Sequence, residues 1–205
     1  MSARSASRRE GPRPGLGDHG GSVIEMLVAS AILVLMAVPI FALFEGGTRI
    51  FARGDAAAGL HQDLRATVDR MMRDLRMAGY DPSATGSPAA FEVATATTVR
   101  FLADADLDGT TDRIEYAYVA PERTITRQFW RWSGGWGPGS GALVVARNVD
   151  GLALSYFNAT DGAAATLGDI RRVAISITGS DVAAGATDGR ERFTVASDAR
   201  PRNLP

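Results

Sequence analysis

Residues 26–44 read MLVASAILVLMAVPIFALF, a run of 19 residues without a charged side chain. At a rise of about 1.5 Å per residue, a helix of this length extends about 28 Å, close to the hydrocarbon thickness of a bilayer. A helix that is apolar on all sides near one end of a chain is poorly explained as a core helix. We therefore expect residues 21–44 to form a transmembrane helix.

The residues before this helix set its orientation. Residues 1–20 carry four arginines against two acidic residues. By the positive-inside rule, we expect them to form a cytoplasmic leader and the rest of the chain to be exported across the membrane in a single pass. Two other export signals are weaker. Arg8 and Arg9 lack the apolar residues that follow a twin-arginine motif, and the small residues 29–31 lie inside the apolar run.

Residues 19–25, HGGSVIE, stand directly before the apolar run. They resemble the class III signal of type IV pilins and type II secretion pseudopilins. In that family a prepilin peptidase removes a basic leader that ends in glycine, the new terminus is N-methylated, and the fifth mature residue is glutamate. The resemblance implies cleavage between Gly20 and Gly21 and gives Glu25 the position of that glutamate. Gly21 departs from the family, whose first mature residue is normally Phe or Met.

Glu25 is a functional candidate on physical grounds as well. A carboxylate beside a hydrocarbon span is costly unless it is paired or lies at the interface. One interpretation is a simple boundary residue at the membrane surface. The resemblance implies instead that Glu25 attracts the amino terminus of a neighbouring subunit, so that the helices dock in register.

Helical periodicity continues after the apolar run. Apolar residues recur at three- and four-residue spacing, with charged residues mostly between them, at Leu60, Leu64, Val68, Met71, Met72 and Leu75. This pattern predicts an amphipathic helix over residues 45–80, with stop signals at Gly79 and Pro82. Residues 72–82, MRDLRMAGYDP, resemble the helix end of PilW-like minor pilins, which are related to the J-type minor pseudopilins.

Breakers inside this long helical region predict kinks or loosened turns. They are Pro39, the pair Gly46 and Gly47, Gly54 and Gly59.

After Pro82 the hydrophobic period changes from about 3.6 to 2. We expect strands at residues 98–102, 114–120, 124–132, 143–149, 152–157, 170–177 and 192–195. Residues 121–123 predict a hairpin turn, and residues 200–204 resemble the family's terminal strand. Residues 81–205 thus predict an antiparallel β-sheet head. The expected fold class is α+β, type IV pilin-like, with a long N-terminal helix packed on that head.

Residues 104–115, DADLDGTTDRIE, match the ligand spacing of a 12-residue EF-hand calcium loop. The predicted ligands are Asp104, Asp106, Asp108, Thr110, Asp112 and Glu115. Strand-like runs flank this loop where an EF-hand has helices, so a solvated, aspartate-rich hairpin is an equal alternative. Any bound calcium would be structural, and no cofactor is otherwise required.

The sequence gives little indication of an enzyme. The chain has a formal charge of -1, no cysteine, and two histidines, His19 and His61. No motif pairs a nucleophile with a base, so we predict no catalytic residues and no enzyme activity, and we interpret His61 as an exposed helix residue. Residues 127–136 interleave arginines and aromatics, but one such cluster without a basic field predicts a strand with outward arginines rather than a nucleic-acid site.

The sequence therefore predicts a minor pilin-like structural subunit. Its expected partners are prepilin peptidase, the inner membrane, and other major and minor pilins, and its expected final location is a pilus or pseudopilus. The alternative is a signal-anchored periplasmic binding domain, such as a calcium-dependent adhesin, that keeps its leader and never enters a filament.

Overall fold

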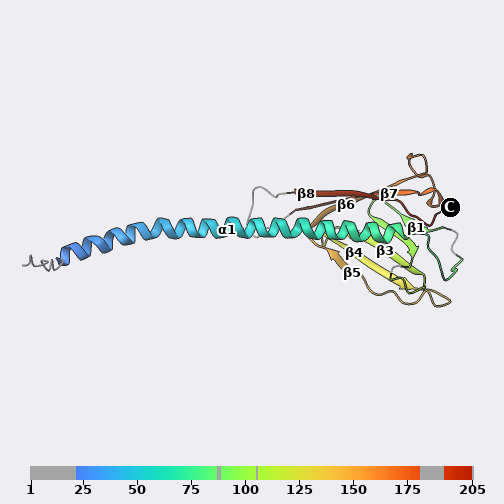
Figure 1. Ribbon diagram of the computed structural model, residues 1–205, viewed down its shortest axis with the longest axis horizontal. Coiled ribbons are helices and arrows are strands. Elements are labelled where there is room, and N and C mark those ends of the chain that lie inside the picture. Colours follow the sequence, from blue (N-terminus) through green and yellow to red (C-terminus); the bar gives the residue numbers. More distant parts are fainter. Residues whose placement is uncertain (1–21, 87–88, 105, 181–191, 205) are drawn as a thin grey trace, which may run out of the picture. The chain divides into compact units, whose positions relative to one another are not determined.

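A computed structural model of the chain describes residues 22–86, 89–104, 106–180 and 192–204. This part contains one α-helix, α1 (Val23–Arg76), and eight strands (Figure 1). The predicted leader, residues 1–20, and both residues of the predicted cleavage junction, Gly20 and Gly21, lie outside the described residues. The chain divides into two compact units, Met1–Arg49 and Ile50–Pro205. The second unit holds the sheets together with the C-terminal part of α1.

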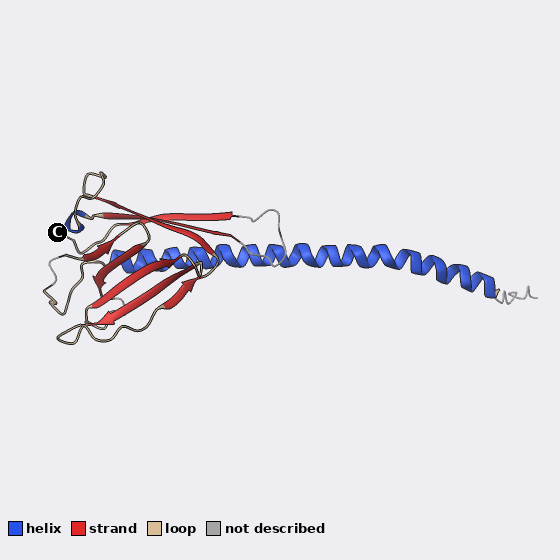
Figure 2. Ribbon diagram, turned by 180° about the vertical axis from the view of Figure 1, so that it is seen from behind, coloured by secondary structure: helices blue, strands red, loops and turns tan. Residues whose placement is uncertain are grey.

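The strands form two antiparallel sheets in which consecutive strands are neighbours (Figure 2). The five-stranded sheet consists of β1 (Phe91–Ala94), β2 (Thr98–Ala103), β3 (Asp112–Val119), β4 (Thr124–Arg131) and β5 (Leu143–Ala146). The three-stranded sheet consists of β6 (Val149–Phe157), β7 (Arg172–Ser180) and β8 (Arg192–Ala199), with a short 3-10 helix, η1 (Leu167–Asp169), before β7. The predicted α+β class and the antiparallel head are confirmed.

Several predicted strand positions need correction. The short strand β1 was not predicted, because only four residues pair and its pattern is brief. The strand predicted over residues 143–149 ends at Ala146 as β5, and only its last residue, Val149, belongs to β6 in the other sheet. Asn148 lies between them with a φ of 58°, a left-handed conformation that breaks an extended run. The hairpin turn predicted at residues 121–123 is confirmed, since β3 pairs with β4 directly around it.

The terminal strand suggested for residues 200–204 is wrong, because β8 ends at Ala199. Pro201 has no N–H to donate to a ladder. The chain turns back to the helix instead, and the Arg202 N–H donates to the Arg76 carbonyl at 3.1 Å.

α1 is one continuous helix of 54 residues that includes Pro39, so the predicted kinks or loosened turns do not divide it into separate helices. No neighbouring atom lies within 4 Å of a Cβ built on Gly46, Gly47, Gly54 or Gly59, so no packing contact distorts the helix at these glycines. Each glycine costs roughly 1 kcal/mol relative to alanine. Alanines and other strong helix formers on both sides offset that cost.

The helix ends where the predicted stop signal stands. Gly79 has a φ of 89°, and its N–H donates to the Leu102 carbonyl on β2 at 2.9 Å. A Cβ at this position would lie 2.8 Å from Leu204 Cδ2 and 3.0 Å from the Asn203 carbonyl oxygen. Only glycine meets both the backbone conformation and the close approach of the C-terminal segment.

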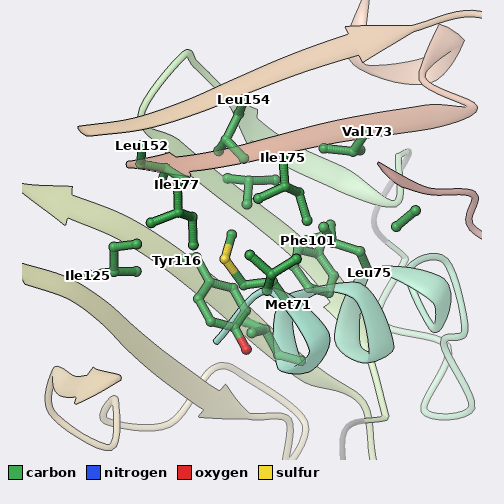
Figure 3. Close-up of a cluster of buried hydrophobic side chains, with 14 of the residues drawn as sticks. Met71, Leu75, Phe101, Tyr116, Ile125, Leu152, Leu154, Val173, Ile175 and Ile177 are labelled. Carbon is green, nitrogen blue, oxygen red and sulfur yellow. The ribbon is translucent and has the colours of Figure 1, made fainter. Parts of the chain in front are cut away.

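The core of the head is built from the helix and the inner faces of both sheets. Figure 3 shows Met71 and Leu75 on α1 beside Phe101 and Tyr116 of the five-stranded sheet, with side chains of the three-stranded sheet completing the cluster. The helical apolar stripe supplies Leu60, Leu64, Val68, Met71 and Leu75, all buried. Burying such side chains contributes about 1.5–3 kcal/mol each, which makes this part of α1 an element of the head.

Candidate functional site

The N-terminal part of α1 presents its apolar side chains outward. Between Val23 and Phe44 the large apolar side chains are 52–77% exposed. By length and composition this helix could cross a membrane, and none of its most apolar window is buried within the protein. A buried core helix of a soluble protein is excluded for this window by that exposure.

Charged residues bound the apolar run at both ends. Glu25 lies in the first turn of α1 and is exposed. After the run, Glu45 and Arg49 form an exposed i,i+4 ion pair with 3.6 Å between their charged atoms. Inside the run, the Ser30 hydroxyl donates to the Leu27 carbonyl at 2.9 Å and thus needs no water. Glu25 is therefore the single ionisable residue of residues 22–44. It lies in the first turn of α1, where the positive end of the helix dipole stabilises a carboxylate.

The second candidate is the acidic loop between β2 and β3. Asp104, Asp106 and Asp108 bring carboxylate oxygens within 4.8 Å of one another, the separation that a shared cation requires. Asp104 is 2% exposed. Its two oxygens accept the backbone N–H groups of Asp108 at 3.1 Å and Gly109 at 3.0 Å. These two hydrogen bonds to Asp104 stabilise the turn of the loop at Asp108 and Gly109.

Arg131 supplies the positive charge of this cluster. Its Nη2 lies 2.5 Å from Asp106 Oδ2 and 3.4 Å from Asp108 Oδ2, and its Nε lies 3.8 Å from Asp112 Oδ1. The carboxylates raise the pKa of the Arg131 guanidinium, with Asp108 contributing most. The pKa of Asp108 is lowered, chiefly by the hydrogen bond from the Thr110 N–H. One guanidinium thus offsets part of the negative charge of the acidic loop.

Only three of the six predicted calcium ligands converge in the described residues. Glu115, predicted to close the loop, belongs to β3 and binds Arg100 across the strand pair, with 2.5 Å between their charged atoms. Asp112 is also in β3 and 2% exposed, and Thr110 donates its N–H to Asp108 Oδ1 at 2.8 Å. Calcium takes six to eight oxygens. The geometry favours the aspartate-rich hairpin, and calcium binding stays a prediction.

Thr111 has a role that the calcium pattern did not reveal. It is fully buried, and its hydroxyl donates to Asp81 Oδ1 at 2.5 Å. Its N–H donates to the Ser83 hydroxyl at 2.8 Å, while the Ser83 N–H donates to the Thr111 hydroxyl at 3.0 Å. These bonds join the acidic loop to the segment after α1. A threonine where calcium loops carry an aliphatic residue was the signal in the sequence.

A buried polar contact between α1 and the sheet was also missed. Asp74 Oδ2 accepts hydrogen bonds from the Tyr116 hydroxyl at 2.7 Å and from Arg127 Nε at 2.9 Å. Burial, reinforced by the charge of Asp74, raises the pKa of Tyr116 well above its usual range. Burial lowers the pKa of Arg127, but the charges and hydrogen bonds of Asp74 and Tyr116 together raise it above its usual value. The prediction that the arginines of this strand face outward is wrong for Arg127, which is 9% exposed.

Other predicted surface residues are engaged within the head. His61 is half-buried, with its ring centroid 5.5 Å from that of Phe193, so its interpretation as an exposed residue is wrong. The guanidinium of Arg100 lies 5.3 Å from the centroid of Trp130, and that of Arg113 lies 4.0 Å from Trp136. These cation-π contacts use the aromatic rings that a single-stranded nucleic acid would need for stacking.

No family model matches the chain, and no curated protein matches it.

Proposed function

We propose that this chain is a structural subunit of the minor pilin or pseudopilin type, which acts by assembly rather than catalysis. One observation carries the proposal. The large apolar side chains in the N-terminal part of α1 are exposed, whereas the apolar side chains of its C-terminal part are buried in the core of the β head. Such a helix anchors the head in a bilayer and offers an apolar surface to other helices. The signal-like sequence around Gly20 and Gly21 supports the same function.

In this proposal the leader, residues 1–20, stays in the cytoplasm and prepilin peptidase removes it. The apolar helix then leaves the inner membrane by packing against the helices of other major and minor pilins. Glu25, the lone ionisable group of that helix, pairs with the amino terminus of a neighbour and fixes the register. The head remains periplasmic and makes the lateral contacts of the pilus or pseudopilus.

The test is the mass of the protein extracted from membranes with and without prepilin peptidase. We expect a mature chain that begins at Gly21 when the peptidase is present and a chain that retains residues 1–20 when it is absent. Gly20→Leu, which removes the glycine before the cut, should block processing. Gly21→Ala is the matched control and should still be cut.

An uncut chain in both membranes would overturn the proposal. It would favour a signal-anchored periplasmic binding domain, for which the acidic loop at Asp104, Asp106 and Asp108 is the first surface to test for calcium. Cleavage at another position, after the small residues 29–31, would mark the apolar run as an ordinary signal peptide and would also contradict filament assembly.

A further inference from the structure

A groove of about 710 Å³ lies where the end of α1 meets the acidic loop and the C-terminal segment. Three of its lining residues are arginines, Arg73 and Arg76 from the last turn of α1 and Arg202 from the C-terminal segment. All three are exposed. Among the residues that the structure describes, no carboxylate lies within ion-pair distance of their guanidinium groups.

The two acidic residues of the lining do not neutralise these arginines. Asp74 is bound to Tyr116 and Arg127, and Asp104 accepts two backbone N–H groups of its own loop. Asp74 is thus paired with another arginine and Asp104 is only 2% exposed, so the exposed charges of the lining are those of the three arginines.

The helix end itself opposes anion binding, since the C-terminus of a helix carries partial negative charge. Two of its carbonyls are already satisfied. The Arg76 carbonyl accepts the Arg202 N–H at 3.1 Å, and the Met77 carbonyl accepts the Tyr80 N–H at 3.0 Å. This capping leaves the guanidinium groups as the main charges that a ligand meets.

The shape and the rim of the groove indicate the kind of ligand. A second hollow of about 520 Å³ shares Arg76 and Arg202. Its other charged residues offset each other, because the exposed Asp198 lies beside Arg200 in the lining and Arg200 is 3.6 Å from Asp161. Apolar surface adjoins the first groove, because Leu107 is 73% and Tyr80 41% exposed. A groove with three exposed arginines beside apolar surface is complementary to a chain segment that mixes carboxylates with apolar side chains.

We propose that this groove binds an acidic segment of a partner protein, whose carboxylates pair with Arg73, Arg76 and Arg202. Planar guanidinium groups bind carboxylates bidentately, which gives direction as well as charge attraction. The proposal goes beyond the assembly function and does not depend on it, because an anchored binding domain would present the same groove.

The experiment measures binding of a short fluorescein-labelled peptide that alternates glutamate and leucine, by anisotropy, to the full chain in nonionic detergent. Arg76→Ala and Arg202→Ala should each weaken binding about two- to fivefold, the range expected for partly exposed charge pairs. The double variant should lose roughly tenfold or more. Arg76→Lys keeps the charge but lacks the planar guanidinium that binds a carboxylate bidentately. Its affinity for the peptide should lie between those of Arg76→Ala and the unchanged protein.

Arg147→Ala is the matched control, because Arg147 is an exposed arginine of the head that lines neither hollow. It should bind the peptide as the unchanged protein does. An equal loss in Arg147→Ala would overturn the proposal by showing that net charge alone attracts the peptide. So would equal binding of a peptide with glutamine in place of glutamate, or tighter binding of an oligothymidylate of the same charge.

Discussion

Arg127 Nε lies 2.9 Å from Asp74 Oδ2, and this contact joins α1 to strand β4 across 53 positions of sequence. The Tyr116 hydroxyl donates to the same carboxylate oxygen at 2.7 Å. The interface between the helix and the sheet is largely apolar and contains this buried charge pair together with the hydrogen bond from the Thr67 hydroxyl to the Val145 carbonyl. A charge pair so placed adds little net stability, but it is costly to break from one side.

Asp74→Asn should destabilise the head by about 2–4 kcal/mol, because the substitution leaves the guanidinium of Arg127 buried without a counter-charge. Denaturant unfolding of the full chain in detergent, followed by tryptophan fluorescence, measures this, since Trp130, Trp132 and Trp136 all lie in the head. Asp69→Asn is the control, being an exposed aspartate on the same helix. Equal losses in the two variants would contradict the assigned role of Asp74.

The head should lose stability as the pH rises above the usual tyrosine range, near pH 10. Burial raises the pKa values of Tyr116 and Tyr156, so both stay protonated in the folded head while the unfolded chain loses its protons. Their contribution is therefore fully present below the ordinary pKa and declines above it, by at most about 1.4 kcal/mol per pH unit for each tyrosine. Unfolding free energies from pH 8 to 11 measure the slope. Tyr116→Phe should flatten it, whereas an unchanged slope would contradict the assignment.

Substitutions at two glycines should change stability in opposite directions. Gly79→Ala should cost about 1–3 kcal/mol, because alanine is strained at this positive φ and its methyl group meets the C-terminal segment. Gly59→Ala should instead add up to about 1 kcal/mol, because nothing lies within 4 Å of that position in the helix. Thermal unfolding of both variants compares them, and a stabilised Gly79→Ala would show that the helix end tolerates a side chain.

Calcium should have little effect on the unchanged protein, because Arg131 already pairs with Asp106 and Asp108. Arg131→Gln removes this charge and leaves Asp106 and Asp108 to repel each other. We expect the variant to melt at a lower temperature and to regain stability in calcium at about 1 mM, the range of weak extracellular sites. Magnesium at equal concentration is the control. Strong calcium stabilisation of the unchanged protein would favour the EF-hand-like interpretation instead.

Glu25→Gln should separate processing from assembly. The variant keeps the cleavage junction and the apolar helix, so we expect leader removal to continue. Loss of the carboxylate should reduce recovery of the protein in sheared filament fractions at least several-fold, as measured by immunoblot. Ser30→Ala is a control on the same helix, because the Ser30 hydroxyl bonds only to its own backbone. Normal filament recovery of Glu25→Gln would favour a simple boundary residue.

The sequence predicted the fold class and most strands because these follow from local hydrophobic periods. It located the buried stripe of α1 from Leu60 to Leu75 for the same reason. It missed the division between β5 and β6 because both flanking runs are extended and apolar. The left-handed conformation of Asn148 depends on the arrangement of the two sheets rather than on local pattern.

The functional residues were harder to place. The residue spacing predicted six calcium ligands in the acidic loop. In the structure the register of β2 and β3 places Glu115 opposite Arg100, and the two side chains form an ion pair. Cross-strand pairing of this kind is a property of tertiary structure. Likewise, nothing local distinguishes Asp74 from the other aspartates of α1 until Arg127 and Tyr116 are known to face it. Gly20 and Gly21 lie outside the described residues, and their role rests on the sequence motif.

The side chains of α1 from Leu60 to Leu75 are part of the core of the head, so the helix is held along about four turns rather than at a single point. Mechanical tension applied along this helix would act in shear on Leu64, Met71 and Leu75 and on the hydrogen bond from Thr67 to the Val145 carbonyl. Such a contact yields only when many side chains slide together. Sliding the helix out of the head would therefore require the core packing and this hydrogen bond to break together.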